Sequence, residues 1–193
     1  MIQSRGVFDE FAIDYDRWFD DHGAVYEAQV RTLRDAVPCC GRGLEVGVGS
    51  GRFAVPLGIG YGIDPSRELL KIAKSRGIEV MIGVGEHLPY RADSFDYVLM
   101  MTVICFLDDA EAVFREVNRR LRPRGMLIVG FIEKDGEIYR RYQHEPTKGR
   151  FLRFAAYWTV KEVTQFFSDT GFAQVSVIDR TRGFCIMNGQ KRC

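Results

Sequence analysis

Hydrophobic residues along the chain follow two patterns: helical spacing and short continuous apolar runs. Helical spacing covers residues 8–19, where Phe8, Phe11, Tyr15 and Phe19 recur every three or four residues, and resumes over 25–33 after a break at 21–23. Short apolar runs predict strands at residues 44–48, 60–63, 79–83, 95–101 and 126–132, and the last two suit strands buried on both faces. Further helices are expected at residues 65–73, 108–121 and 159–167.

Strands that alternate with helices predict an α/β fold, a parallel sheet with helices on both faces and right-handed crossovers. Two final strands, 174–178 and 184–188, are separated by five residues, Asp-Arg-Thr-Arg-Gly. This connection is too short for a crossover helix, so it predicts a hairpin. We therefore expect one domain over residues 1–193, with an antiparallel last strand at the edge of the sheet.

Local signals mark where two of the helices begin. Ser66 follows Asp64 and Pro65 and is a candidate start for the helix that comes next. Thr159 and Glu162 have the spacing of a capping box, and Gly171 marks the end of that helix.

A glycine-rich segment follows the first predicted strand. Gly47, Gly49 and Gly51 permit positive φ angles and close approach of a ligand to the backbone, and Asp64 ends the second strand, where a ribose diol could donate to it. The spacing is G-x-G-x-G, not the G-x-G-x-x-G of dinucleotide sites, and Glu45 would repel a pyrophosphate. The segment therefore favours a nucleoside-like ligand that carries positive charge.

Several motifs in order resemble one known family. They are E-x-G-x-G-x-G at residues 45–51, the aspartate after the second strand, Gly-Glu-His-Leu-Pro at 85–89 and Asp-Ser-Phe-Asp-Tyr at 93–97. Together they resemble the class I S-adenosylmethionine-dependent methyltransferases, most closely the small-molecule branch of quinone-biosynthesis type. The resemblance runs from about residue 8 to the end of the chain. It implies a Rossmann-like, seven-stranded, mostly parallel sheet whose last strand is antiparallel.

The resemblance also implies site residues. The glycine loop would pack against the methionine part of the cofactor, and Asp64 would hold the ribose hydroxyls. Gly85 and Glu86 would lie beside the adenine, where the family usually has Ala-Glu or Asp-Ala. The residues assigned in this way to S-adenosylmethionine, or to its product S-adenosylhomocysteine, are Glu45, Gly47, Val48, Gly49, Gly51, Asp64, Pro65, Gly85, Glu86, His87, Met101 and Thr102.

Composition narrows the choice of partners. With 27 basic and 26 acidic residues the formal net charge is +1, which argues against nucleic acid as a partner. The five cysteines have no metal-ligand spacing, so no metal site is expected. Their odd number, without a secretion signal, indicates a cytoplasmic protein. No apolar run approaches the roughly 20 residues that span a bilayer.

Two aromatic segments stand outside the core pattern. Residues 133–158 have no clean period, and a connection of this length is usually functional or mobile. It emerges beyond the carboxyl ends of the strands, where the N-terminal helix of residues 1–22 could also lie. We expect the two segments to cap the substrate site. Arg140, Arg141 and Tyr142 favour an acceptor with a carboxylate, phosphate or phenolate; the alternative is that the aromatic residues form a subsidiary core.

Methyl transfer requires alignment of acceptor, methyl and sulfur and exclusion of water, and no catalytic residue is strictly necessary. If the acceptor must lose a proton, Tyr15, His22 and His144 are the candidate bases. The acidic residues of the first helix, including Asp14, Asp16, Asp20 and Asp21, are interpreted as its solvated face.

Alternatives remain at this point. An RNA methyltransferase would need a basic face, for which residues 133–158 are the candidate. A noncatalytic cofactor-binding regulator would share all the motifs. A nicotinamide-dependent oxidoreductase is disfavoured by the glycine spacing and the final hairpin. An arsenic methyltransferase would need cysteines around its acceptor, and only Cys105 falls near the expected pocket.

Overall fold

The computed structural model describes residues 2–144 and 150–192 and contains a sheet of seven strands in the order β3-β2-β1-β4-β5-β7-β6. The strands are β1 (Gly43–Val46), β2 (Tyr61–Asp64), β3 (Glu79–Ile82), β4 (Phe95–Met101), β5 (Leu121–Ile132), β6 (Phe172–Thr181) and β7 (Phe184–Lys191). The helices are α1 (Ile2–Glu10), α2 (Ala12–Asp21), α3 (Gly23–Ala36), α4 (Arg67–Ser75), α5 (Ala110–Arg120), α6 (Glu137–His144) and α7 (Val160–Asp169), with short 3-10 turns η1 (Ile104–Phe106) and η2 (Leu152–Phe154).

The strand directions confirm the predicted sheet and correct one detail. β3, β2, β1, β4 and β5 pair in parallel, and β7 runs antiparallel to both β5 and β6. The last strand, β7, was expected at the edge, but it lies between β5 and β6. Its first four residues, Phe-Cys-Ile-Met, are all buried, whereas β6 carries exposed polar residues along its length. The apolar strand of the hairpin therefore takes the inner position and the polar strand takes the edge.

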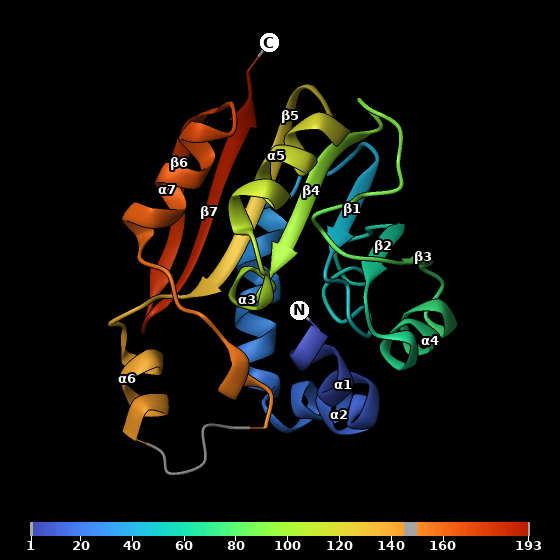
Figure 1. Ribbon diagram of the computed structural model, residues 1–193, viewed down its shortest axis with the longest axis vertical. Helices are drawn as coiled ribbons and strands as arrows, with labels where there is room; N and C mark the ends of the chain where they lie inside the picture. Colours follow the sequence, from blue (N-terminus) through green and yellow to red (C-terminus); the bar gives the residue numbers. More distant parts are fainter. Residues whose placement is uncertain (1, 145–149, 193) are drawn as a thin grey trace.

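Helices cover both faces of the sheet, as the alternation of elements predicts (Figure 1). α3 and α4 pack on one face, where Leu33, Leu70 and Ala73 join one hydrophobic cluster. α5 and α7 pack on the other face, where Phe114 and Phe167 join a second cluster. The central strands β1 and β4 are buried along almost their whole length, which explains their apolar runs, whereas β3 is largely exposed.

The predicted helix starts are also confirmed. The Ser66 side chain accepts a hydrogen bond from the Leu69 backbone N–H at the start of α4. Thr159 and Glu162 form the reciprocal bonds of a capping box at the start of α7. These bonds satisfy backbone donors that have no partner within the first turn.

The N-terminal region differs from the prediction. The helix expected over residues 8–19 is broken at Phe11, where the backbone leaves the helical conformation, so that α1 and α2 are separate. Both helices lie beyond the carboxyl ends of the parallel strands rather than on a face of the sheet (Figure 1). The spacing of apolar residues is the same on both sides of Phe11, and therefore it does not reveal the break.

The sequence after the glycine loop is compatible with a helix, but this segment forms turns instead. The turns cover residues 52–58 and end at Gly58, which has φ of +68°. β1 and β2 are therefore joined without a crossover helix whose N-terminus could hold a phosphate.

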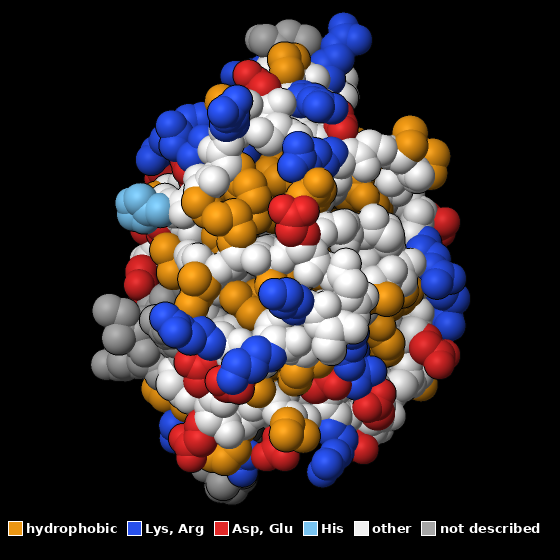
Figure 2. Space-filling view, turned by 90° about the vertical axis from the view of Figure 1, so that its right-hand side faces the viewer, with side chains coloured by type: hydrophobic (Ala, Val, Ile, Leu, Met, Phe, Trp, Pro, Cys, Tyr) orange, Lys and Arg blue, Asp and Glu red, His pale blue; other side chains and the backbone are white. Residues whose placement is uncertain are grey.

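On the side of the molecule that carries β3 and α4, positive and negative side chains are interspersed (Figure 2). Within the described residues, no helix is long and apolar enough to cross a membrane, and no group of three or more His, Cys, Asp or Glu residues could hold a metal ion.

Candidate functional site

A cavity of about 60 Å³ lies where the carboxyl ends of β1, β2 and β4 meet the N-terminal helices. Its lining comes from the glycine loop, the ends of β2 and β4, the start of α4, η1 and the helices α1 and α2. The lining residues are Phe8, Tyr15, Gly47, Gly49, Asp64, Pro65, Leu69, Met101, Thr102, Val103 and Phe106.

The glycine loop forms one wall of this cavity through its backbone. Gly47 has φ of +74°, and a Cβ atom at this position would lie 2.4 Å from a Val103 methyl carbon. Gly49 has φ of +52°, and a Cβ there would lie 3.3 Å from the Tyr15 ring. Both the backbone conformation and the space therefore require glycine at Gly47, and the loop presents bare backbone to the cavity.

Asp64 fixes the loop from the end of β2. One carboxylate oxygen accepts a hydrogen bond from the Gly49 N–H at 2.9 Å, and the other accepts from the Ser66 N–H at 2.8 Å. Burial raises the pKa of Asp64 to about 6, although these two hydrogen bonds act in the opposite direction. A buried, rigidly oriented carboxylate thus stands at the floor of the cavity.

Glu45 lies beneath the same loop and is only 1% exposed. Its Oε2 atom has no hydrogen-bond partner among the described residues. Burial, and then repulsion by Asp64, raise the pKa of Glu45 well above its usual range. Two neighbouring carboxylates with so little compensation form a site where a bound cation would be stabilised.

These features fit S-adenosylmethionine, which carries a sulfonium and an ammonium group. The bare glycine backbone leaves space for close contact, and Asp64 can accept hydrogen bonds from ribose hydroxyls. The Glu45 carboxyl, whose Oε2 has no partner among the described residues, lies beneath the loop, and a bound cation would favour its charged form. A pyrophosphate would meet these carboxylates with like charge, as the sequence predicts.

An aromatic cluster covers the cavity from the other side. It consists of Phe8, Tyr15, Phe106 and Phe151, whose ring centroids lie 5.0–5.5 Å apart. Burial raises the pKa of Tyr15 above its usual range, and the negative charges of Asp64 and Glu45 raise it further. The Tyr15 hydroxyl therefore stays protonated at neutral pH and can donate a hydrogen bond.

α2 is held against the glycine loop by charged hydrogen bonds. The Asp16 carboxylate accepts two bonds from Arg52 and two from Arg76, at 2.7–2.8 Å. Arg76 also donates to the Ser50 carbonyl oxygen at 2.7 Å. Burial acts to raise the pKa of Asp16, but hydrogen bonds from Arg76 and Arg52 prevail and hold this pKa well below its usual range.

The interpretation of Asp16 as part of a solvated helix face is therefore wrong, since its side chain is 16% exposed. Helical periodicity places Asp16 on the same helix as exposed acids, but its partners come from residues far along the chain, which periodicity does not show.

Two further contacts join α1 and α2 to neighbouring segments. Arg150 donates to the Asp14 carboxylate at 2.7 Å and lies over the Phe11 ring, 3.7 Å from its centroid. Asp9 accepts from the Ser66 hydroxyl at 2.7 Å, at the start of α4. The two aromatic segments singled out by the sequence, residues 1–22 and 133–158, are thus in direct contact beside the cavity.

The structure brings together only some of the predicted site residues. Tyr15, Gly47, Gly49, Asp64, Pro65, Met101 and Thr102 line the cavity. The other predicted residues do not line it: Glu45 is buried beneath the loop, Val48 packs against Gly62, Gly51 against Ile78, Gly85 against Val113, Glu86 accepts from the Asp108 N–H, and His87 is exposed.

Of the two histidines considered as a base, His22 does not line the cavity. His22 is exposed at the junction of α2 and α3, where its ring stacks on Trp18 and its Nδ1 lies 2.9 Å from the Trp18 carbonyl oxygen. His144 ends α6, and its side chain lies outside the described part of the structure. The exposed Arg140, expected near the acceptor, donates instead to the Asp135 carbonyl oxygen.

Phe8 and Leu69 are lining residues that the sequence did not identify as such. Their helical spacing made them indistinguishable from core residues. A position just after Asp64, at the start of the next helix, could have indicated Leu69, because that helix begins at the same edge of the sheet.

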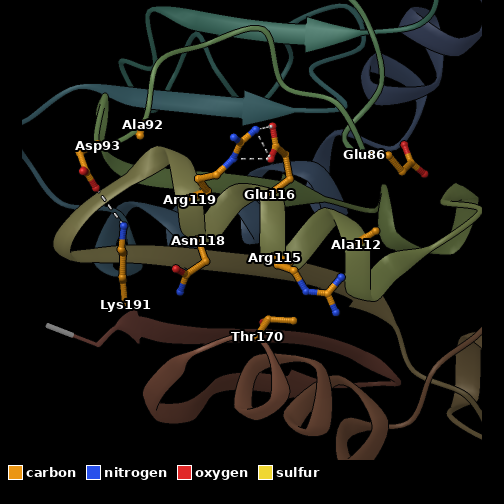
Figure 3. A pocket seen from close by; sticks show the side chains of 10 residues that line it. All are labelled: Glu86, Ala92, Asp93, Ala112, Arg115, Glu116, Asn118, Arg119, Thr170 and Lys191. Carbon is orange, nitrogen blue, oxygen red and sulfur yellow. Dashed lines mark hydrogen bonds and ion pairs between the residues drawn. The ribbon is translucent and has the colours of Figure 1, made fainter.

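A second, larger groove of about 620 Å³ runs along the outer side of α5 (Figure 3). Its side chains include Arg119, which pairs with Glu116, and Lys191, which pairs with Asp93. Two other lining residues, Glu86 and Asn118, each have a buried side-chain atom without a hydrogen-bond partner among the described residues.

Comparisons with known proteins identify the family. Residues 44–129 match the model of a methyltransferase domain. An uncharacterized protein of Methanocaldococcus jannaschii is 38% identical over 169 residues, covering 88% of this chain and 82% of that protein. A demethylmenaquinone methyltransferase of Roseiflexus castenholzii is 30% identical over 120 residues, covering 56% of this chain and 50% of that enzyme.

A solved structure agrees with this match. It is a SAM-dependent methyltransferase of Thermotoga maritima, described as a possible histamine N-methyltransferase, with a TM-score of 0.90 and 33% sequence identity. The match covers 97% of this chain and 99% of that one. The family model, the fold and the site chemistry agree, and the chain belongs to the S-adenosylmethionine-dependent methyltransferases.

Proposed function

We propose that this enzyme transfers the methyl group of S-adenosylmethionine to a small-molecule acceptor held under a cap formed by residues 1–22 and 133–158. The observation that carries this proposal is the cavity itself, where the glycine loop and Asp64 face the aromatic cluster across one small space. The Roseiflexus relative is named a demethylmenaquinone methyltransferase and the Thermotoga relative a possible histamine N-methyltransferase. Both names refer to small-molecule acceptors and so support this choice.

In this proposal one group of residues binds the cofactor and another shields and aligns the acceptor. The cofactor, which supplies an electrophilic methyl group when bound, is held by Glu45, Gly47, Gly49, Asp64, Pro65, Met101 and Thr102. Phe8, Tyr15, Phe106 and Phe151 exclude water and align the acceptor, which is the main requirement of such a transfer. The remaining predicted contacts, Val48, Gly51, Gly85, Glu86 and His87, would act through loop packing or at the adenine side.

The cap must also move. Pockets for small molecules usually have volumes of about 300–1,000 Å³, far above the 60 Å³ of this cavity. Phe8 and Tyr15 would therefore have to swing outward with α1 and α2 before a nucleoside-sized cofactor could enter, and close again for transfer.

An RNA acceptor is less well supported. Binding to a phosphate backbone requires clustered, available cations. The near-neutral charge and the interspersed charges on the face in Figure 2 do not provide such a cluster there.

Calorimetry tests the proposal. We expect S-adenosylmethionine and S-adenosylhomocysteine to bind at one site per chain, and NAD to bind much more weakly. Binding of NAD without any response to S-adenosylmethionine would overturn the assignment of the cavity.

A further inference from the structure

We infer that Cys39 and Cys40 form a redox-sensitive modification site, at which a hydroperoxide joins the two adjacent thiols in a reversible disulfide. Neither residue lines the cofactor cavity. The site therefore goes beyond the proposed function and does not depend on it.

Both thiols of the pair are accessible to solvent. Cys39 and Cys40 are exposed, free cysteines on the short connection between α3 and β1. The two other cysteines that the structure describes, Cys105 and Cys185, are buried, and Cys193 lies outside the described residues. Among the described thiols, an oxidant in solution therefore reaches the adjacent pair first.

The two buried cysteines are also less reactive in a chemical sense. Burial raises the pKa of Cys105 and of Cys185 to about 12, so both thiols stay protonated at neutral pH. The thiolate is the form of cysteine that attacks an oxidant. Burial and protonation therefore both protect these residues, and within the described part of the chain they leave oxidation to the exposed pair.

Among the described cysteines, each thiol of the pair can reach only its neighbour. The pair precedes β1, at the amino end of the parallel strands, which lies away from α1 and α2 (Figure 1). Cys105 instead follows the carboxyl end of β4, and Cys185 pairs with Phe131 near the carboxyl end of β5. Because a disulfide requires Cα atoms within about 7 Å of each other, neither buried cysteine can bond to the pair while the sheet is folded.

The connection that carries the pair is held at both ends. The Val37 N–H donates to the Leu33 carbonyl oxygen at 2.8 Å, where α3 ends. The Arg42 N–H donates to the Asp96 carboxylate at 2.7 Å, and the Asp96 N–H donates to the Arg42 carbonyl oxygen at 2.9 Å. The two thiols therefore stay on a short anchored segment, where an oxidised sulfur on one residue has the other thiol beside it.

A disulfide between adjacent residues is easily reversed. Consecutive Cα atoms are about 3.8 Å apart, whereas the Cα atoms of ordinary disulfides are roughly 4.4–6.8 Å apart. The resulting strain and the exposure to solvent make such a bond easier to reduce than a structural disulfide. These properties suit a modification that can be switched, and not a bond that stabilises the fold.

Metal binding is the other common use of paired cysteines, and the surroundings of this pair do not support it. Structural zinc sites take four protein ligands. Over residues 2–144 and 150–192, no group of three or more His, Cys, Asp or Glu residues could hold a metal ion. Two thiols without further ligands are better suited to bonding with each other.

The bond changes balance with hydrogen peroxide as the added oxidant. The thiolate of one cysteine attacks a peroxide oxygen, the O–O bond breaks, and a sulfenic acid and one water form. The second thiol then attacks that sulfur, the S–O bond breaks, and the disulfide and a second water form. The two sulfurs together lose two electrons, and dithiothreitol returns them by thiol–disulfide exchange.

Peptide mass spectrometry after treatment with hydrogen peroxide tests the site. Free thiols are blocked by alkylation, and trypsin then releases residues 35–42, which contain Cys39 and Cys40 and no other cysteine. We expect this peptide to lose two hydrogens, to escape alkylation, and to return to its reduced mass after dithiothreitol. Full alkylation of the peptide, irreversible oxidation to sulfinic acid, or a disulfide to any other peptide would overturn the inference.

Single variants test whether the two thiols react with each other. In Cys39→Ser and in Cys40→Ser the remaining thiol has no neighbour, so its sulfenic acid should persist and be trapped by dimedone. The parent should show little trapping, because the second thiol removes the sulfenic acid. Both positions are exposed, so neither substitution should disturb the fold. Equal trapping in the parent and in both variants would contradict a disulfide within the pair.

The buried cysteines provide the control for accessibility. In the folded protein, Cys105 and Cys185 should react with peroxide at least about tenfold more slowly than the pair, because they are buried and protonated. In urea this difference should disappear. If the buried cysteines react as fast as the pair in the folded protein, the fold does not select Cys39 and Cys40 for oxidation.

Discussion

The floor and the roof of the cavity are built in different ways. The floor consists of the glycine loop and Asp64, which lie within twenty residues of one another and act largely through backbone contacts. The roof consists of α1, α2 and the region of Phe151, held by side chains from distant parts of the sequence. The floor can therefore be recognised from a local sequence motif, whereas the contacts of the roof join residues that are distant in the sequence.

The largest effect is expected from filling the floor. Gly47→Ala places a methyl group against Val103 and forces an L-residue into a positive φ angle, so we expect the free energy of unfolding to fall by about 2–5 kcal/mol. Gly58→Ala is the control, because Gly58 also has positive φ, +68°, but has open space around it. The Gly58→Ala substitution should lower the free energy of unfolding by only about 1–2 kcal/mol. Urea unfolding measures both, and equal losses would show that space at the floor does not matter.

The next effect concerns the carboxylate at the floor. Asp64→Asn keeps the shape but removes the charge that ribose hydroxyls and the cationic cofactor would meet, so affinity for S-adenosylmethionine should fall at least about tenfold in calorimetry. Unchanged affinity would show that the ribose is held elsewhere.

The titration of Asp64 predicts how stability and cofactor affinity change with pH. The pKa of Asp64 in the fold, about 6, exceeds its ordinary value of 3.8, so the folded state favours the protonated form. The parent protein should therefore lose stability relative to Asp64→Asn as the pH rises from about 4 to 6, and the difference should level off above 6. Cofactor affinity of the parent should rise over the same interval if the bound cofactor favours the carboxylate.

The difference between floor and roof also explains what the sequence could predict. The strands, the hairpin, the capping box and the family follow from local spacing, and the structure or the comparisons confirm them. The inner position of β7, the break at Phe11 and the partners of Asp16 depend on pairing between distant residues. A helical pattern shows that a side chain is apolar, but not whether it faces the core or, like Phe8, a ligand site.

An intermediate effect is expected at the contact between floor and roof. Asp16→Asn weakens the bonds to Arg52 and Arg76, so α2 should open more often and S-adenosylhomocysteine should dissociate several times faster in stopped-flow measurements. Asp20→Asn is the control, because Asp20 is exposed and bonds only Arg52 among the described contacts. Identical dissociation rates in the parent and Asp16→Asn would show that this contact does not hold the roof closed.

The smallest effect is expected in the roof itself. Tyr15→Phe removes only a hydroxyl that stays protonated, so turnover should remain within about threefold of the parent from pH 6 to 9. A general base typically increases the reaction rate by about 100-fold to 10,000-fold. A loss of turnover of that size in Tyr15→Phe, with an altered pH profile, would therefore indicate that Tyr15 acts as a base. Tyr15→Ala provides the contrast, because it deletes the ring that packs on Gly49, Phe8 and Phe151. We expect that variant to lose at least about tenfold in turnover, since the acceptor would no longer be aligned or shielded from water.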